Sequence, residues 1–134
     1  MSCFKLPKSW CYELQSFIAK FWWGQRESEH RIHWVKWMAL CRLKHAGGIG
    51  FRDLHSFNLA LLAKQGWRLL TNTFSLFYRV FKPKYFPHGN FLHASVGSNS
   101  SYIWKNFMAA QPLLRQGSKW KVGNGSRINI WLDG

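Results

Sequence analysis

The feature that most constrains the fold is the glycine-rich turn at residues 47–50, Gly-Gly-Ile-Gly, which leads into a strong helix signal over residues 54–71. Glycine readily adopts positive φ angles, so this stretch predicts a tight turn. Asp53 is a typical helix N-cap, and good helix formers dominate residues 54–71. Gly66 costs a helix interior about 1 kcal/mol relative to Ala, which predicts a close packing contact at that position.

A second helix is expected over residues 7–23. Its large apolar residues are spaced by four, three and four positions, which builds one apolar stripe and predicts a packed helix. The stripe consists of Trp10, Leu14, Phe17 and Phe21. The other expected elements are a strand-like entry over 32–34, a helix over 35–42, a helix over 76–85 capped by Ser75, a helix capped by Ser101 that reaches Leu114, and a β-hairpin over 119–131.

The hairpin is predicted from the Asn124-Gly125 pair, which lies between two short segments of β-prone residues. The expected fold class is therefore mainly α, a small helical bundle of about five helices with a C-terminal β-hairpin. Residues 87–100 are rich in Gly, Ser, Asn and His and form the best internal boundary. They divide the chain into 1–86 and 101–134, which we expect to form one compact unit.

The charge balance indicates a polyanionic partner. The chain has 19 Lys and Arg against 5 Asp and Glu, a formal net charge of +14. Such a surface attracts nucleic acid, because neutralised phosphates release counterions. An anionic membrane surface is the second candidate. A basic charge balanced by an acidic domain elsewhere in a longer protein is the third interpretation, and charge alone does not separate them.

Basic residues interleaved with aromatic ones give the best functional signal. Lys64 and Arg68 lie four apart on one helix, and Arg79, Lys82 and Lys84 follow on the next. Because cations contact phosphates and aromatic rings stack on bases, these five residues are the candidate nucleic-acid-binding set. The alternative is a solvated basic face over an ordinary aromatic core. Residues that could extend the surface are Arg26, Arg31, Lys36, Arg42, Lys44 and Arg52.

No catalytic, metal-binding or cofactor-binding pattern is found, and we expect the chain not to be an enzyme. Its acids are Glu13, Glu27, Glu29, Asp53 and Asp133, with no two adjacent, whereas two-metal phosphoryl transfer needs clustered carboxylates. The Cys and His spacings lack the paired pattern of zinc sites. The glycine turn lacks the Gly-Lys-Ser/Thr ending of a phosphate-binding loop.

The three cysteines, Cys3, Cys11 and Cys41, are irregularly spaced, which argues against a disulfide framework and fits a reducing compartment. No secretory signal is visible, and no window approaches the roughly 20 apolar residues of a membrane-spanning helix. We therefore expect an intracellular chain without a membrane span.

A series of short motifs runs through almost the whole chain: FWWG at 21–24, IHW at 32–34, LC at 40–41, GGIGFRDL at 47–54, FN at 57–58, ALLAKQ at 60–65, WR at 67–68, YFP at 85–87, SYIW at 101–104, VGNG at 122–125 and IWLD at 130–133. In this order they resemble the plant LINE-type (non-LTR) retrotransposon reverse transcriptases, downstream of the polymerase palm. The resemblance implies that residues 1–86 are thumb-like helices and residues 101–134 a connector. For the full-length polyprotein it implies RNA-templated DNA synthesis.

The sequence departs from this family at the point that matters for catalysis, since it contains no Asp-Asp pair as the family's palm motif requires. The family's endonuclease, Cys/His and ribonuclease H-like segments are also absent. We therefore expect a noncatalytic fragment that binds RNA or an RNA–DNA duplex, with the missing palm or other polyprotein segments as former intramolecular partners. The alternative is a pseudogene-derived structural or interaction remnant with no selected activity. The resemblance leaves both nucleus and mitochondrion open as the location.

Overall fold

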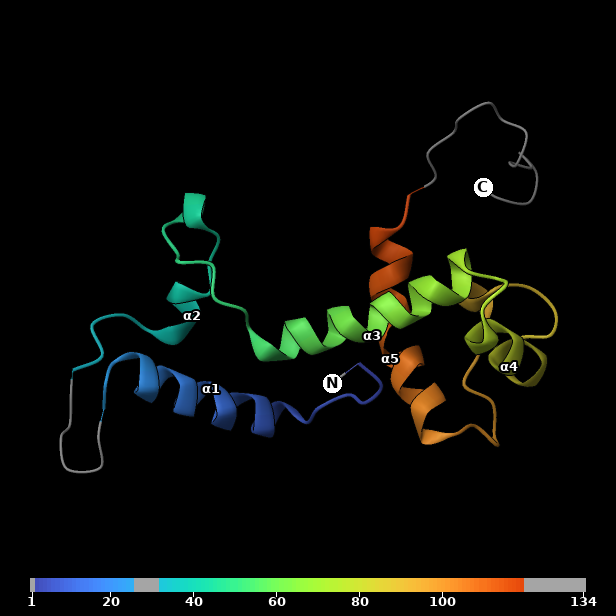
Figure 1. Cartoon of the computed structure of the whole chain (residues 1–134), viewed down its shortest axis with the longest axis horizontal. Coiled ribbons are helices and arrows are strands. Elements are labelled where there is room, and N and C mark those ends of the chain that lie inside the picture. The colour runs from blue at the N-terminus through green and yellow to red at the C-terminus, as the bar shows by residue number, and fades with distance from the viewer. Residues whose placement is uncertain (1, 26–31, 120–134) are drawn as a thin grey trace.

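A computed structural model describes residues 2–25 and 32–119, and the long helix α3, Leu54–Thr71, is its central element. With 18 residues, α3 spans about 27 Å. Helix α1, Lys8–Trp22, starts near the beginning of α3 and extends beyond it toward the segment that precedes α3, and α5, Tyr102–Gly117, crosses the second half of α3 (Figure 1). The 54–71 helix predicted from the sequence is thus confirmed.

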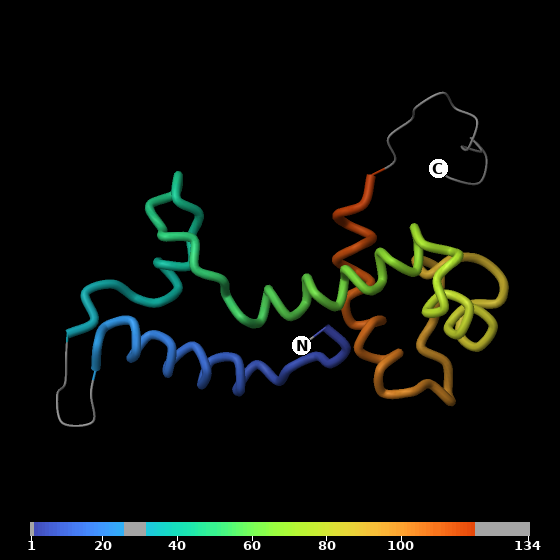
Figure 2. Tube along the Cα trace, in the orientation of Figure 1, coloured from blue at the N-terminus to red at the C-terminus, as the bar shows by residue number. Residues whose placement is uncertain are grey.

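The remaining elements lie at the two ends of α3 and give the described part an elongated shape (Figure 2). Helix α2, Trp37–Leu40, and the 3-10 helix η1, Lys44–Ala46, lie between α1 and α3 in the chain. Helix α4, Leu76–Tyr85, and the 3-10 helix η2, Phe91–His93, lie between α3 and α5. Helix α3 therefore connects the part that contains α1 and α2 to the part that contains α4 and α5 (Figure 1).

The described residues form five α-helices and two 3-10 helices and contain no β-strand, so the predicted fold class is wrong in its β component. The strand-like entry expected over 32–34 is not a strand. Its Trp34 side chain is 78% exposed, so that no neighbouring segment covers it. The helix expected over 35–42 is reduced to the four residues of α2. The hairpin expected over 119–131 lies outside the described residues except for Lys119.

Three helices begin where the sequence predicts, because a side chain caps each one. Asp53 accepts a hydrogen bond from the Ser56 backbone N–H at 2.8 Å. Ser75 and Ser101 accept from the backbone N–H groups three residues further along α4 and α5. Each cap satisfies a donor that the helix itself leaves unpaired.

The main core lies where the second half of α3 meets α4, η2 and α5. Its largest fully buried side chains include Leu62, Phe91, Trp104 and Phe107. Gly66 of α3 lies at the crossing with α5, where an added Cβ would lie 2.6 Å from Phe91 Cε1 and 2.7 Å from Leu114 Cδ1. The predicted close contact at this glycine is therefore confirmed.

Helix α1 packs through a different face from the one expected. Its buried residues are the small or polar Cys11, Gln15 and Ala19, and Gln15 Nε2 donates to Asp53 Oδ1 at 2.6 Å. The predicted apolar stripe of Trp10, Leu14, Phe17 and Phe21 is exposed instead. Polar contacts also hold the segment before α1, because Asn58 of α3 bonds to the Leu6 N–H and the Phe4 carbonyl, both at 2.9 Å.

Candidate nucleic-acid interface

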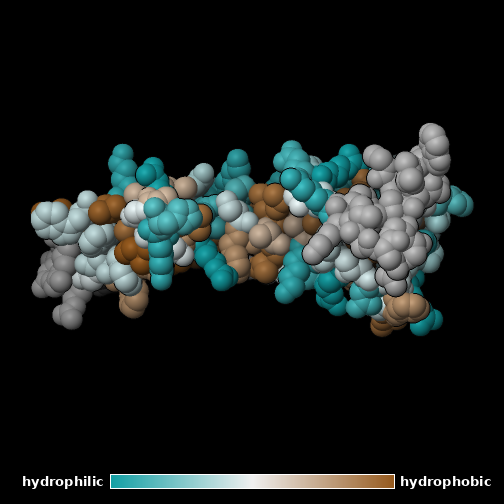
Figure 3. All heavy atoms as spheres, turned by 90° about the horizontal axis from the view of Figure 1, so that it is seen from above, coloured by the Kyte–Doolittle hydropathy of each residue, from teal (hydrophilic) through white to brown (hydrophobic). Residues whose placement is uncertain are grey.

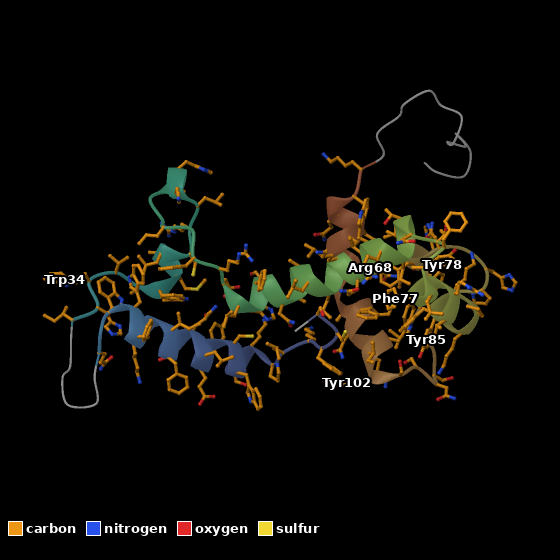
Figure 4. The ribbon with its side chains drawn as sticks, viewed as in Figure 1. Trp34, Arg68, Phe77, Tyr78, Tyr85 and Tyr102 are labelled. Atoms are coloured by element: carbon orange, nitrogen blue, oxygen red, sulfur yellow. The ribbon has the colours of Figure 1, made fainter. Side chains whose placement is uncertain are left out.

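The five predicted nucleic-acid-binding residues lie on two helices at one end of the molecule. Lys64 and Arg68 belong to α3, and Arg79, Lys82 and Lys84 belong to α4. The turn over residues 72–75 folds α4 back toward α3, and the guanidinium carbon of Arg68 lies 5.6 Å from the Phe77 ring centroid. Figure 4 shows Arg68, Phe77, Tyr78 and Tyr85 together at this end, with Trp34 at the other.

Aromatic rings position three of the five cations. Arg68 lies over Phe77 and also donates to Gln65 Oε1 at 3.1 Å. Lys82 Nζ donates to the Tyr78 hydroxyl at 2.9 Å and lies 5.3 Å from the centre of that ring. Lys84 Nζ lies 5.3 Å from the centre of the Tyr85 ring. Each such contact is worth about 0.5–1 kcal/mol at an exposed site, so it limits where the charge can point.

Arg79 and Lys82 share a surface hollow of about 440 Å³. Tyr78 contributes a ring to the same hollow, and the remaining lining residues are Thr73, Pro83 and Pro87. Two cations beside an aromatic ring can contact a phosphate while the ring stacks on a base or sugar. This hollow brings together two of the five candidate residues.

The five residues do not form a single patch. Successive residues on a helix are about 100° apart, so Lys84 points to a different side of α4 from Lys82 and Arg79. Its neighbour Tyr85 bonds to Ser101, its hydroxyl lying 2.8 Å from Ser101 Oγ. Hydrogen bonding to Ser101 lowers the pKa of the Tyr85 phenol, with burial opposing this effect. Lys64 is exposed on α3 one turn before Arg68.

The additional basic residues named from the sequence are spread over the other half of the molecule. Lys36 and Arg42 line a second hollow of about 480 Å³ near α2, together with Cys41 and Asp53. The Arg52 guanidinium carbon lies 4.6 Å from the Phe57 ring centroid. Arg26 and Arg31 lie outside the described residues.

Sequence reasoning did not single out Lys119 and Arg115. Lys119 lines a hollow of about 490 Å³ with Trp67, Leu113, Leu114, Gly117 and Ser118. Arg115 instead donates to the Leu92 carbonyl, with Nε at 2.8 Å, and so ties α5 to η2. Periodicity within α5 identifies neither contact, because each depends on an element distant in the chain.

Hydrogen bonds, burial and a nearby charge shift the pKa values of Asp53, Cys11 and Cys41. Hydrogen bonding from Ser56 lowers the pKa of Asp53, which burial opposes and the bond from Gln15 reinforces. Burial raises the pKa values of Cys11 and Cys41, and the Asp53 charge raises them further. These thiols therefore stay protonated at neutral pH, where a thiolate would be the nucleophile. Within residues 2–25 and 32–119, no three His, Cys, Asp or Glu side chains gather as a metal site.

The surface around these sites is mixed. Figure 3 shows hydrophobic atoms on the upper face, at the left and near the centre, among hydrophilic side chains. Among the described helices, none combines the length and apolar character needed to cross a membrane.

Two plant proteins are similar to this chain. One, named as an uncharacterised mitochondrial protein of Arabidopsis thaliana, is 42% identical over 134 residues, which cover 99% of this chain and 87% of that protein. The other, provisionally named as a ribonuclease H protein of Arabidopsis thaliana, is 34% identical over 139 aligned residues. That alignment covers 99% of this chain but only 22% of the longer protein. No protein-family model matches the chain, and no solved structure matches it significantly.

Proposed function

Because the chain belongs to the same family as the uncharacterised mitochondrial protein of Arabidopsis thaliana, we propose that it derives from a plant transposable element. More specifically, we propose a noncatalytic piece of a LINE-type reverse transcriptase that binds RNA or an RNA–DNA duplex. The motif series supports this origin. The name of the longer relative fits it, since the resemblance implies a ribonuclease H-like segment in the full-length polyprotein.

The observation that carries nucleic-acid binding is the hollow on α4. Arg79 and Lys82 place two cations beside the Tyr78 ring, in a chain whose net charge is +14. Arg68 and Lys84 add charge on the other side of α4, each over an aromatic ring. A backbone that follows α4 could therefore contact phosphates on both sides of the helix. Contacts to phosphates do not distinguish one base from another, so we expect binding that depends on charge and not on the nucleotide sequence.

The proposal is noncatalytic because the sequence offers no paired carboxylates. Its five acids are scattered and none is adjacent to another. Polymerase and ribonuclease H chemistry both use metal ions held by clustered carboxylates. Incorporation of a nucleotide, or cleavage of the RNA strand of a hybrid, by the purified chain would contradict this part of the proposal.

Fluorescence anisotropy with a labelled RNA–DNA duplex tests the binding site. We expect the logarithm of the affinity to fall linearly with the logarithm of the salt concentration. Changing Arg79 and Lys82 to Ala should weaken binding about tenfold at low salt and reduce the magnitude of the slope by about two, because two phosphate contacts are lost. Thermal melts of the variant check that the loss of the Lys82–Tyr78 contact leaves the fold intact.

The matched control changes Lys8 and Lys44 to Ala. Both are exposed, the net charge falls by the same amount, and neither lies on α3 or α4, since Lys8 begins α1 and Lys44 begins η1. This control should bind nearly as well as the wild-type chain. Equal weakening by the two double variants, or binding that does not respond to salt, would refute an interface on α4.

The exposed apolar stripe of α1 favours the second candidate, an interaction or structural remnant with no selected activity. This candidate predicts strong binding of a hydrophobic dye and no salt-dependent binding of nucleic acid. A monomeric chain that does not increase the fluorescence of the dye would count against this candidate.

We also propose that this chain is located in mitochondria, because the first relative is named as a mitochondrial protein. A fluorescent fusion of the chain should therefore enter plant mitochondria. Accumulation in the nucleus would contradict the mitochondrial location and support the alternative that the resemblance leaves open.

A further inference from the structure

Helix α1 presents four large apolar side chains to solvent on one face. The exposed fractions are 62% for Trp10, 44% for Leu14, 57% for Phe17 and 85% for Phe21. A single exposed aromatic residue is ordinary, but a continuous row of them marks an interaction surface. The buried face of α1 is a different one, carrying Cys11, Gln15 and Ala19, so packing within the described part does not use the row.

The spacing of this row indicates what kind of surface covers it. Steps of four, three and four residues place Trp10 and Phe17 at d positions and Leu14 and Phe21 at a positions of a heptad. Ile18, at the neighbouring e position, is also exposed and widens this surface on one side. An a and d repeat is typical of pairing with another helix. The occupant expected from the spacing is therefore a helix with the same repeat.

Charged residues at the edge of the seam indicate that this second helix is α1 of another copy. Glu13 and Lys20 occupy g positions, and Lys20 Nζ lies 5.8 Å from the Phe17 ring centroid, beside the seam. When two copies of α1 pair in antiparallel fashion, Trp10 faces Phe21 and Leu14 faces Phe17 of the second copy. The same register brings Glu13 of each copy close to Lys20 of the other. A parallel pairing instead places Glu13 near Ile18.

We propose that two copies of the chain associate through α1, which packs antiparallel on α1 of the second copy with Glu13 and Lys20 paired across the seam. The four seam residues of each copy can together bury about 1,000 Å² over both copies, estimated from the size of such side chains and their exposed fractions. That area is near the lower limit for a specific interface, so a dimer of micromolar affinity is expected.

Salt distinguishes this association from nucleic-acid binding. Each copy carries a formal charge of +14, so two copies repel each other at low ionic strength. Salt screens this repulsion and leaves the apolar seam intact. Dimerisation should therefore strengthen between 0.1 and 0.5 M NaCl, whereas binding to a phosphate backbone weakens over the same range.

Sedimentation velocity on the full chain, from low micromolar to about 100 µM, tests the proposal, because dimerisation depends on concentration by mass action. The wild-type chain should shift from monomer to dimer. Phe17→Glu should weaken the dimer about a hundredfold or more, because it removes apolar contact and places a charge in both halves of the seam. Phe74→Glu is the matched control, since Phe74 is 94% exposed and lies outside the seam, and it should dimerise normally.

A charge swap tests the antiparallel register. Glu13→Lys places two lysines near each other at both ends of the seam and should weaken the dimer about tenfold. Lys20→Glu should do the same with two carboxylates. The double variant with Glu13→Lys and Lys20→Glu restores opposite charges and should regain the wild-type dissociation constant. Circular dichroism of each variant reports whether α1 remains helical.

Three results would overturn the proposal. The first is a wild-type chain that stays monomeric up to about 100 µM in 0.5 M NaCl, a range in which micromolar dimers are populated. The second is a dimer that Phe74→Glu weakens as much as Phe17→Glu does. The third is a chain that is monomeric on its own, sediments with anionic vesicles, and loses this vesicle binding in the Phe17→Glu variant. That result would assign the seam to a membrane surface. Failure of the charge swap to restore the dimer would refute the antiparallel register.

Discussion

Replacing Asp53 should weaken the attachment of α1 to α3, because this one carboxylate bonds to both helices. Its Oδ2 accepts the Ser56 backbone N–H at 2.8 Å and caps α3. Its Oδ1 accepts Gln15 Nε2 of α1 at 2.6 Å. Gln15 is only 4% exposed, so its amide has no access to bulk water if the carboxylate is removed.

The two bonds set the size of the expected loss. An N-cap contributes about 1 kcal/mol. A hydrogen bond to a charged group contributes about 1.5–3 kcal/mol, and a buried donor left unpaired carries a desolvation cost within the same range. Asp53→Ala should therefore lower the free energy of unfolding by about 3 kcal/mol. Asp53→Asn keeps an oxygen acceptor and a good N-cap residue, so it should lose only about 1 kcal/mol.

The contribution of Asp53 should also depend on pH in a defined direction. Because its pKa is lowered in the folded chain, the stabilisation is fully present above the unfolded-state pKa of about 3.9. It is lost as the pH falls through the lower pKa of the folded state. The stability difference between wild type and Asp53→Ala should therefore shrink below about pH 4, while Asp53→Asn shows no such titration at this position.

Urea unfolding followed by circular dichroism measures these differences, and Gln15→Ala completes a double-mutant cycle with Asp53→Ala. We expect a coupling energy of about 1–2 kcal/mol between the two residues, since they share one short hydrogen bond. The reasoning is refuted if Asp53→Ala and Asp53→Asn are equally stable at pH 7. A coupling energy near zero would show that the Gln15 bond does not join the helices in solution.

Two further substitutions probe the other end of the molecule. Gly66→Ala gains about 1 kcal/mol of helix propensity. It also drives a Cβ into the buried Phe91 ring, and such overpacking costs about 1–3 kcal/mol. Urea unfolding should therefore show a net loss of stability of about 1 kcal/mol. Gly117→Ala, whose added Cβ meets nothing within 4 Å, is its control, and a Gly66→Ala chain more stable than wild type would contradict the packing. Tyr85→Phe removes the hydroxyl that bonds to Ser101 and should cost about 1 kcal/mol, measured by thermal melts against Tyr12→Phe at an exposed site. Equal melting temperatures for these two variants would show that the Tyr85–Ser101 bond contributes nothing.

Local chemistry made the helix starts predictable. Asp53, Ser75 and Ser101 each bond to a backbone N–H only three residues away, so the residues that decide these boundaries lie next to one another in the sequence. The close contact at Gly66 was predictable for a related reason, because a glycine inside a strong helix costs stability and so implies a neighbour. The identity of that neighbour, Phe91 with Leu114, depends on the tertiary fold and was not predictable.

The face used by α1 was not predictable from hydrophobic periodicity. Periodicity finds the face with the largest apolar residues, but the buried residues of α1 are Cys11, Gln15 and Ala19. Small residues allow the two helices to approach, and Gln15 reaches Asp53 only because the chain folds back over a separation of 38 residues. The pattern therefore identified a real apolar face without revealing that this face lies in solvent.

Only part of the candidate interface was predictable. Helix geometry alone separates Lys84 from Arg79 and Lys82, since 100° per residue puts positions 79 and 82 on one side and 84 on another. The hollow itself depends on Pro87 and Thr73, which approach Arg79 only because of the turns at both ends of α4. The position of Arg68 over Phe77 likewise depends on the turn over 72–75.

The crossing of α5 over only the second half of α3 has a consequence for how the molecule opens. Amide hydrogens near Leu62 and Leu69 lie in the core with Trp104 and Phe107, so their exchange with solvent requires the core to open. Amides near Ser56 are held by the Asp53 cap and by α1, which contacts α3 through a smaller and partly polar face. One continuous helix should therefore show slow exchange at one end and faster exchange at the other, and the α1 end can detach while the α5 end stays folded.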